Sequence, residues 1–148
     1  MLYYLVAFVV VVIDQLTKWA VVHNMSLYES IPLIEGWVHF TSSRNRGAAF
    51  SILQNQRFFF IFLTLIVVVF LVYYIWQIRY SQKLFAFGLS LILGGAIGNL
   101  IDRALTGEVI DFIDIRIINF AIFNIADSAI TIGVIFVIWE LFFGKSIQ

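Results

Sequence analysis

The fold is decided by residues 58–78, FFFIFLTLIVVVFLVYYIWQI, a run of 21 residues without a charged side chain. Arg57 and Arg79 stand at its two ends. A helix of about 20 mostly apolar residues is long enough to cross the hydrocarbon core of a bilayer. The run therefore predicts a membrane-spanning helix.

Three further apolar stretches lie on either side of this one. Residues 84–101 carry no charge, residues 117–139 are interrupted only by Asp127, and the first 22 residues are apolar apart from a short polar group at 14–18. The first stretch has no basic residue before it and no small-x-small cleavage pattern after it, which indicates a retained helix rather than a signal peptide. We therefore expect four spans, at about 1–22, 58–78, 84–101 and 121–143.

The composition excludes most other classes of protein. The chain of 148 residues is 62% hydrophobic and 12% charged, whereas a soluble domain is about 45–50% apolar and about a quarter charged. A body of this size has too much surface to hide so much hydrocarbon from water. The absence of Cys excludes disulfides, thiolate metal sites and a cysteine nucleophile, and the zero net charge argues against nucleic-acid binding. An all-α integral membrane protein of a single domain, 1–148, remains.

The connection between the first two spans, about 23–57, is too polar to cross the membrane. Residues 37–42 mix aromatic and β-branched side chains after Gly36, which predicts a short strand, and residues 44–47 predict a turn. We expect a small β-rich cradle on the extracytoplasmic membrane surface, formed by this first long loop.

Four spans place both termini on one side of the membrane. The short turn 79–83 contains two basic residues, and the tail contains Lys145. The opposite side has more basic residues in total, but their density is highest in the short turn, which we therefore assign to the cytoplasm.

Placing a charged side chain near hydrocarbon costs several kcal/mol of free energy, so such residues are candidates for a function. Asp14 and Lys18 are four residues apart, so a self-neutralising pair on one helix face is one explanation for them. Asn99 and Arg103 also share a face. Arg103 either extends to lipid headgroups or points inward to hold an anionic or carbonyl group.

Two further polar groups lie in apolar surroundings near the C-terminus. Asp111 and Asp114 face opposite ways if their segment is an extended strand, so at most one of them faces a site, and the other is solvated or paired with Arg116. Asn124 and Asp127 share one helix face. Asn124 could cap the last helix, whereas Asp127 has no Lys within four residues, which favours a functional role.

Asp111 and Asp127 are separated by only fifteen residues and can meet. Two carboxyl groups held together in a low dielectric share one proton. The ionised carboxylate can then take a proton from water while the neutral one donates to a peptide carbonyl, and Asn or Arg side chains could stabilise the oxyanion. His23 and His39 lie in the long polar loop without an obvious Ser partner or zinc-ligand spacing.

Two other functions remain open from the residues alone. A proton- or ion-coupled carrier would use Asp14, Asp127 and Lys18 as intramembrane relays, although the chain is small for a transporter and its acids gather at one membrane face. A structural or accessory subunit would pair these acids with the bases of a partner.

Five sequence blocks resemble, in the same order, the bacterial lipoprotein signal peptidases (signal peptidase II). They are DQLTK (14–18), NRGAAFS (45–51), GGAIGNLIDR (94–103), VIDF (109–112) and FNIADS (123–128). The resemblance implies an aspartyl endopeptidase of the bacterial cytoplasmic membrane that cuts before a cysteine bearing a diacylglyceryl group. Its catalytic pair would be Asp111 and Asp127.

The resemblance also implies supporting roles, a location and partners. Four residues would surround the substrate: Asn45, Asn99, Arg103 and Asn124. Asp14 and Lys18 would support the site, and Arg46 stands where many relatives carry a small polar residue, so no catalytic role is assigned to it. The implied partners are a diacylglyceryl-modified prolipoprotein and membrane lipid, without nucleic acid, cofactor or metal. We expect a monomer with both termini in the cytoplasm and its active site near the outer face.

Overall fold

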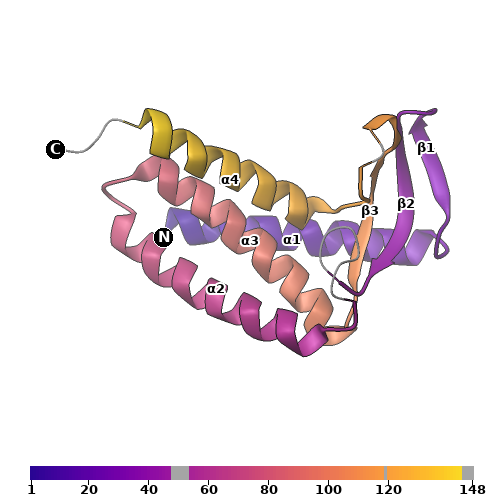
Figure 1. Cartoon of the computed structure of the whole chain (residues 1–148), viewed down its shortest axis with the longest axis horizontal. Coiled ribbons are helices and arrows are strands. Elements are labelled where there is room, and N and C mark those ends of the chain that lie inside the picture. The colour runs from indigo at the N-terminus through magenta and orange to yellow at the C-terminus, as the bar shows by residue number, and fades with distance from the viewer. Residues whose placement is uncertain (48–53, 119, 145–148) are drawn as a thin grey trace.

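The computed structural model describes residues 1–47, 54–118 and 120–144 (Figure 1). Its elements are α1 (Leu2–Asn24), β1 (Ser30–Ile34), β2 (Val38–Asn45), α2 (Arg57–Ile78), α3 (Lys83–Leu105), β3 (Val109–Ile115), the 3-10 turn η2 (Arg116–Ile118) and α4 (Ile125–Phe143). Each of these four α-helices is long and apolar enough to cross a membrane, which confirms the prediction of four apolar helices of spanning length. Lys145 and positions 48–51 of the second sequence block lie outside the described residues.

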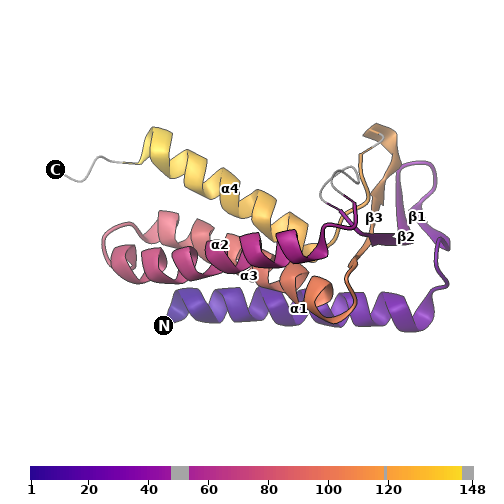
Figure 2. The same ribbon diagram turned by 60° about the horizontal axis from the view of Figure 1, so that its bottom comes forward.

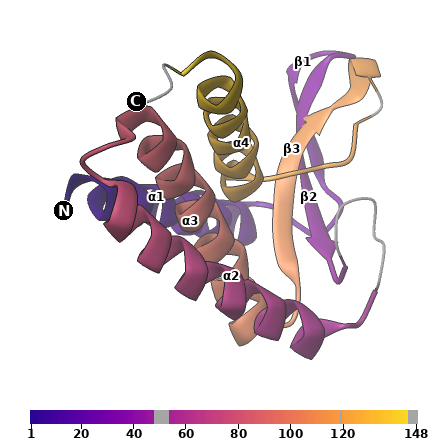
Figure 3. The same cartoon turned by 60° about the vertical axis from the view of Figure 1, so that its left-hand side comes forward.

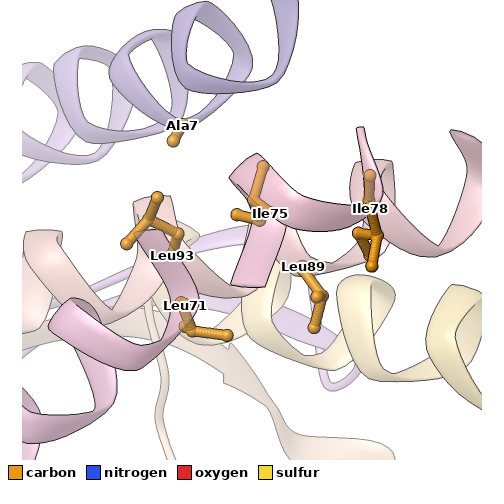
Figure 4. Close-up of a cluster of buried hydrophobic side chains, with 7 residues drawn as sticks. Ala7, Leu71, Ile75, Ile78, Leu89 and Leu93 are labelled. Carbon is orange, nitrogen blue, oxygen red and sulfur yellow. The ribbon is translucent and has the colours of Figure 1, made fainter. Parts of the chain in front are cut away.

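Helix α3 is the centre of the bundle and packs against the other three helices. Glycines allow close approach: a Cβ atom at Gly94 would lie 2.7 Å from the carbonyl oxygen of Ala7 in α1, and one at Gly98 would lie 2.5 Å from Asp14 Oδ2. The Gly94–Gly98 spacing therefore serves helix packing. Figure 4 shows the buried apolar cluster between α1, α2 and α3, which includes Leu71, Ile75 and Leu93.

The three strands form one antiparallel sheet in the order β1-β2-β3. The sheet lies at one end of the helical bundle, while α1 begins and α4 ends at the opposite end (Figures 1 and 2). The expectation of a small β-rich element is confirmed, but its confinement to the first long loop is wrong, because β3 comes from the connection between α3 and α4. A two-stranded hairpin is marginal by itself, and β3 pairs with the edge of β2 that would otherwise be open.

Several boundaries differ from the sequence expectations. The turn expected at 44–47 is wrong for its first half, because Arg44 and Asn45 still pair with Ile110 and Val109 of β3. Helix α4 begins at Ile125 rather than at 121, because Asn124 caps it. Helix α3 continues past 101 to Leu105, since its terminal charged side chains find partners inside the protein.

Candidate active site

A buried ion cluster joins α1 to α3 beneath the sheet. Lys18 Nζ lies 2.8 Å from Asp14 Oδ2 and 2.8 Å from Asp102 Oδ2, and the three side chains are at most 3% exposed. The suggested Asp14–Lys18 pair is therefore only part of a cluster of three charges. Asp14 Oδ1 also accepts a hydrogen bond of 2.9 Å from the backbone N–H of Ala126, which fixes the start of α4.

The sequence reasoning missed Asp102 and Gln15. Gln15 Nε2 donates to Asp102 Oδ1 at 2.9 Å, and the backbone N–H of Ile110 in β3 donates to Asp102 Oδ2 at 3.2 Å. A signal was present, because Asp102 follows Asn99 by three residues and so lies near it on the same helix face. The ion cluster thereby contacts β3 as well as α1 and α3.

Lys18 also orients an amide. Its ammonium donates to Asn99 Oδ1 at 3.0 Å, and Asn99 Nδ2 donates to Asp127 Oδ1 at 2.8 Å. Because the ammonium can only donate, it holds the oxygen of the Asn99 amide on its own side and turns the NH₂ group toward Asp127. The ion cluster is thus linked to Asp127 through one side chain.

Asn124 both caps α4 and contacts the two acids. Its Oδ1 accepts from the backbone N–H of Asp127 at 2.9 Å, and its Nδ2 donates to Asp111 Oδ1 at 2.8 Å. Asp127 Oδ2 accepts in return from the backbone N–H of Asn124 at 3.4 Å, which completes a capping box. The capping role expected for Asn124 is confirmed, and the same side chain brings Asp111 of β3 beside the start of α4.

Asp111 and Asp127 line one cavity of about 250 Å³. Its polar lining also includes Asn45, Asn99 and Arg103, so the structure brings five of the sequence candidates to one space. The remaining lining comes from Val109, Phe120, Ala121, Ile122, Phe123, Ile130 and Thr131. The lining of the cavity therefore combines five polar or charged side chains with a mostly apolar remainder.

The surroundings of Asp111 favour its protonated form. Burial raises the pKa of Asp111 from its usual value to about 7, and the neighbouring charge of Asp127 adds to this rise. Hydrogen bonds from Asn45 and Asn124, and the more distant charge of Lys18, act in the opposite direction but do not cancel it. A carboxyl group with a pKa near neutrality can hold or release a proton at physiological pH.

Arg103 points inward, which settles the alternatives left open by the sequence. Its Nη2 donates to the carbonyl oxygen of Gly47 at 2.9 Å, and its Cζ lies 4.9 Å from the centre of the Phe60 ring. The guanidinium lines the same cavity as the two acids. The guanidinium therefore faces the cavity and the carbonyl oxygen of Gly47.

Asp114 takes no part in this cavity. Its Oδ2 accepts from Thr41 Oγ1 at 2.8 Å and from Arg116 Nε at 2.9 Å. This confirms the expected pairing with Arg116 and the opposite orientation of Asp111 and Asp114 along the strand. Arg46 is exposed and pairs with Glu108 at 2.6 Å.

Neither histidine lines the cavity, but two expectations about them were wrong. His23 lies in the last turn of α1 rather than in a loop, and its ring centre is 4.3 Å from that of Trp19 in a tilted arrangement. His39 has a serine neighbour, since its Nδ1 lies 3.2 Å from Ser30 Oγ. Within the described ranges, no group of three or more Asp, Glu, His or Cys side chains could hold a metal ion.

A family model described as signal peptidase (SPase) II matches residues 6–143. The chain belongs to this family. It is therefore a protease of the signal peptidase II type, and its four apolar helices fit a bacterial membrane protein.

Individual relatives agree with the family assignment. A lipoprotein signal peptidase of Anoxybacillus flavithermus is 55% identical over 136 residues, which cover 90% of this chain and 81% of that protein. One of Brevibacillus brevis is 51% identical over 142 residues, covering 96% and 95% respectively. Two solved structures, each described as a bacterial membrane enzyme studied by the in meso method, superpose with TM-scores of 0.89 and 0.85. Their identities are 41% and 42%, and they cover 99% and 97% of this chain and 92% and 94% of their own.

Proposed function

We propose that this signal peptidase II family member is an aspartyl endopeptidase that removes the signal peptide from diacylglyceryl-modified prolipoproteins, cutting before the lipidated cysteine. The observation that carries the proposal is the shared cavity of Asp111 and Asp127, with Asn124 contacting both. The names of the relatives, which are lipoprotein signal peptidases, support the substrate class.

The proposed mechanism uses one proton shared by the two acids. A water molecule between the carboxyl groups gives a proton to the ionised carboxylate, and its oxygen attacks the scissile carbonyl carbon. The neutral carboxyl group donates its proton to the carbonyl oxygen, so a neutral tetrahedral diol forms. Collapse of the diol breaks the C–N bond, the amine nitrogen takes a proton from the dyad, and the dyad regains its single proton from the diol hydroxyl.

The side chains around the dyad have separate proposed roles. Asn99 and Asn124 hold the two carboxyl groups through their NH₂ groups, at 2.8 Å each. Arg103 and Asn45 also line the cavity and would bind carbonyl groups of the substrate backbone. Asp14 and Lys18 would support the site from behind through Asn99 and the start of α4.

The apolar part of the cavity wall supports a lipid-bearing substrate. Phe123 and Ile130 belong to this wall, and acyl chains could enter sideways from the bilayer rather than through a water-filled cleft. β3, which carries Asp111, lies at the end of the bundle opposite the start of α1 (Figure 1). We propose that this end is the outer face of the cytoplasmic membrane, that both termini are cytoplasmic, and that one domain, 1–148, works as a monomer without cofactor.

The alternative of an ion-coupled carrier is less well supported. Lys18 is 1% exposed and already donates to three acceptors: Asp14, Asp102 and Asn99. An ammonium with three donors and three partners has no vacant position for a transported ion or a relayed proton. These contacts favour a fixed structural role for the lysine.

The proposal is tested with purified protein in lipid and two versions of one precursor, with and without the diacylglyceryl group. We expect cleavage of the lipidated precursor only, with the modified cysteine at the new N-terminus, and no cleavage by the matched variant Asp111→Asn. Equal cleavage of both precursors would contradict the lipid requirement. No cleavage of either, together with pH-gradient-driven flux in liposomes, would support the carrier instead.

A further inference from the structure

An exposed apolar surface lies at the far end of the sheet, where the β1–β2 turn meets η2. We call it the apolar tip, and it comprises Leu33, Ile34, Trp37, Ile117 and Ile118. Each of these side chains is 55–65% exposed. The turn and η2 are joined by a hydrogen bond of 2.9 Å from the backbone N–H of Arg116 to the carbonyl oxygen of Trp37. Two chain segments distant in sequence therefore build one surface, and a contiguous surface of this kind indicates an interaction site.

The length of α1 indicates where the membrane ends relative to the sheet. Its 23 residues rise about 34 Å at 1.5 Å per residue, slightly more than the hydrocarbon core of about 30 Å. Its exposed apolar side chains continue almost to its end, at Leu16, Trp19 and Val22. Figures 1 and 2 show that the last turns of α1 reach the level of the sheet along the long axis of the molecule. The membrane boundary at this end therefore lies at about the level of the sheet.

The sheet lies across the end of the bundle rather than continuing the direction of the helices (Figure 1). Its upper end, where β1 ends and β2 begins, lies on the side of α4 and extends beyond the start of that helix (Figures 1 and 3). This end of the sheet thus projects over the lipid that surrounds the bundle. The apolar tip continues the lipid-facing surface of the spans at the height where hydrocarbon gives way to headgroups.

We propose that the apolar tip docks into the headgroup–acyl boundary of the same membrane, and that its partner is lipid. Tryptophan favours this boundary because its ring is apolar and its N–H is polar, and the backbone of Trp37 is hydrogen-bonded to Ile34 and to Arg116, the residue before Ile117. Glu35 and Arg116 lie beside these apolar residues in sequence. Their charged groups would contact water and headgroups while the apolar side chains enter the lipid. Insertion of this kind is typical of amphipathic surfaces that lie on a bilayer.

Docking has a consequence for the cavity. The chain leaves η2 and reaches α4 through Phe120, Ala121, Ile122 and Phe123, all of which line the cavity. Anchoring η2 in lipid therefore holds one cavity wall and the sheet above it at a fixed height. The inference goes beyond the proposed peptidase function and does not depend on it, because it requires only that the helices span a bilayer.

The test uses fluorescence of Trp37 in a variant that keeps no other tryptophan (Trp19→Phe, Trp76→Phe, Trp139→Phe). The protein is reconstituted in phosphatidylcholine–phosphatidylglycerol vesicles whose acyl chains carry bromine either near the headgroup or near the chain end. We expect bromine near the headgroup to remove at least about half of the Trp37 emission, bromine near the chain end to remove less, and aqueous iodide to have little effect. An Ile118→Trp variant in a tryptophan-free background should respond in the same way.

The matched control keeps only Trp139, which is 56% exposed on the lipid-facing side of α4. Its quenching by brominated lipid shows that the protein is inserted. Quenching of Trp37 by iodide but not by bromine would place the tip in water and overturn the proposal. Protection of Trp37 from both quenchers would also overturn it, in favour of a protein partner or a second copy of the chain.

Discussion

Two groups of acidic side chains lie close together in this protein, and their surroundings are opposite. Asp14 and Asp102 share the ammonium of Lys18, with both N–O distances at 2.8 Å. Asp111 and Asp127 are held by the amide groups of Asn124 and Asn99 instead. Among the described residues, no Lys, Arg or His forms a salt bridge with either member of this second pair.

The difference separates an acid that stabilises a fold from an acid that can react. Breaking a buried pair between a carboxylate and an ammonium costs much free energy of folding. An acid in such a pair therefore serves the stability of the fold. Asp111, by contrast, borders the cavity, and burial raises its pKa to about 7. A carboxyl group of this kind can hold or release a proton near neutral pH. Both groups are needed in this account, because the ion cluster orients Asn99 and the amides orient the dyad.

The largest expected effect comes from Asp111→Asn or Asp127→Asn. Either change removes one half of the proton-sharing pair, so we expect the cleavage rate to fall by about 1,000-fold or more, the order of magnitude of positioned proton transfer. Both variants should stay folded and inserted, because an amide of the same shape replaces each carboxyl group. The measurement is cleavage of a lipidated precursor by purified enzyme.

Asp114→Asn is the matched control for this pair of variants. Asp114 lies three residues from Asp111 on the same strand and contacts Thr41 and Arg116 rather than the cavity. We expect a loss of activity of less than about tenfold, since the change only weakens hydrogen bonds that the largely buried Asp114 accepts away from the cavity. Loss of activity in Asp114→Asn with retention in Asp111→Asn would show that the wrong acid was chosen.

The next largest effect is expected for Lys18→Met. This change leaves Asp14 and Asp102 buried without their cation, which costs about 3–5 kcal/mol of stability for a broken buried pair. Thermal or denaturant unfolding in detergent measures the loss. Lys83→Met serves as the control, because Lys83 is exposed at the start of α3. Equal stability of the two variants would mean that the ion cluster does not hold the bundle together.

A smaller effect is expected for the dependence of kcat/KM on pH. Asp111 is protonated below a pKa of about 7 and ionised above it. The general acid is therefore lost as the pH rises, and we expect kcat/KM to fall about tenfold for each pH unit above this midpoint. A pH–rate profile measured with the stability of the enzyme checked at each point tests this, and a rate that stays constant to pH 9 or so would contradict it.

The smallest effect is expected for Arg46→Thr. The Arg46 side chain is 62% exposed and pairs with Glu108 at the surface. Exposed pairs contribute about 0–1 kcal/mol, so the free energy of unfolding should fall by no more than about 1 kcal/mol, and the cleavage rate should stay within about twofold of that of the unchanged enzyme. A large loss of cleavage would assign Arg46 to the substrate site after all.

The spans were predictable because exposing charge to hydrocarbon costs much free energy, so a spanning helix is visible in the sequence as a long run without charged residues. The uncharged run of α2 and the run 117–139, whose only charged residue is Asp127, are examples. The sheet was only half predictable, since β3 joins β2 across 63 intervening residues and no local pattern specifies such a partner. The start of α4 was misplaced because apolar residues 121–123 continue the hydrophobic pattern, whereas the cap depends on the contacts of Asn124 with its surroundings.

The candidate residues could be listed from the sequence, but their contacts could not. The isolated position of Asp127 and the alternation of Asp111 and Asp114 were visible from spacing. The role of Asp102 in closing the ion cluster was not, because it requires knowing that α1 and α3 lie side by side at this level. The inward direction of Arg103 likewise depends on Gly47 and Phe60, which approach it from other segments.

The central claim is that Asp111 and Asp127 hold one proton between them near neutral pH, and infrared titration of the carboxyl band measures this directly. The account predicts a band that loses its proton with a midpoint of about 7 and that is absent in Asp111→Asn. In Asp127→Asn the midpoint should move to lower pH, because a neighbouring charge that raises the pKa of Asp111 has been removed. A band near neutrality that survives Asp111→Asn, or no carboxyl titration between about pH 6 and 8, would contradict it.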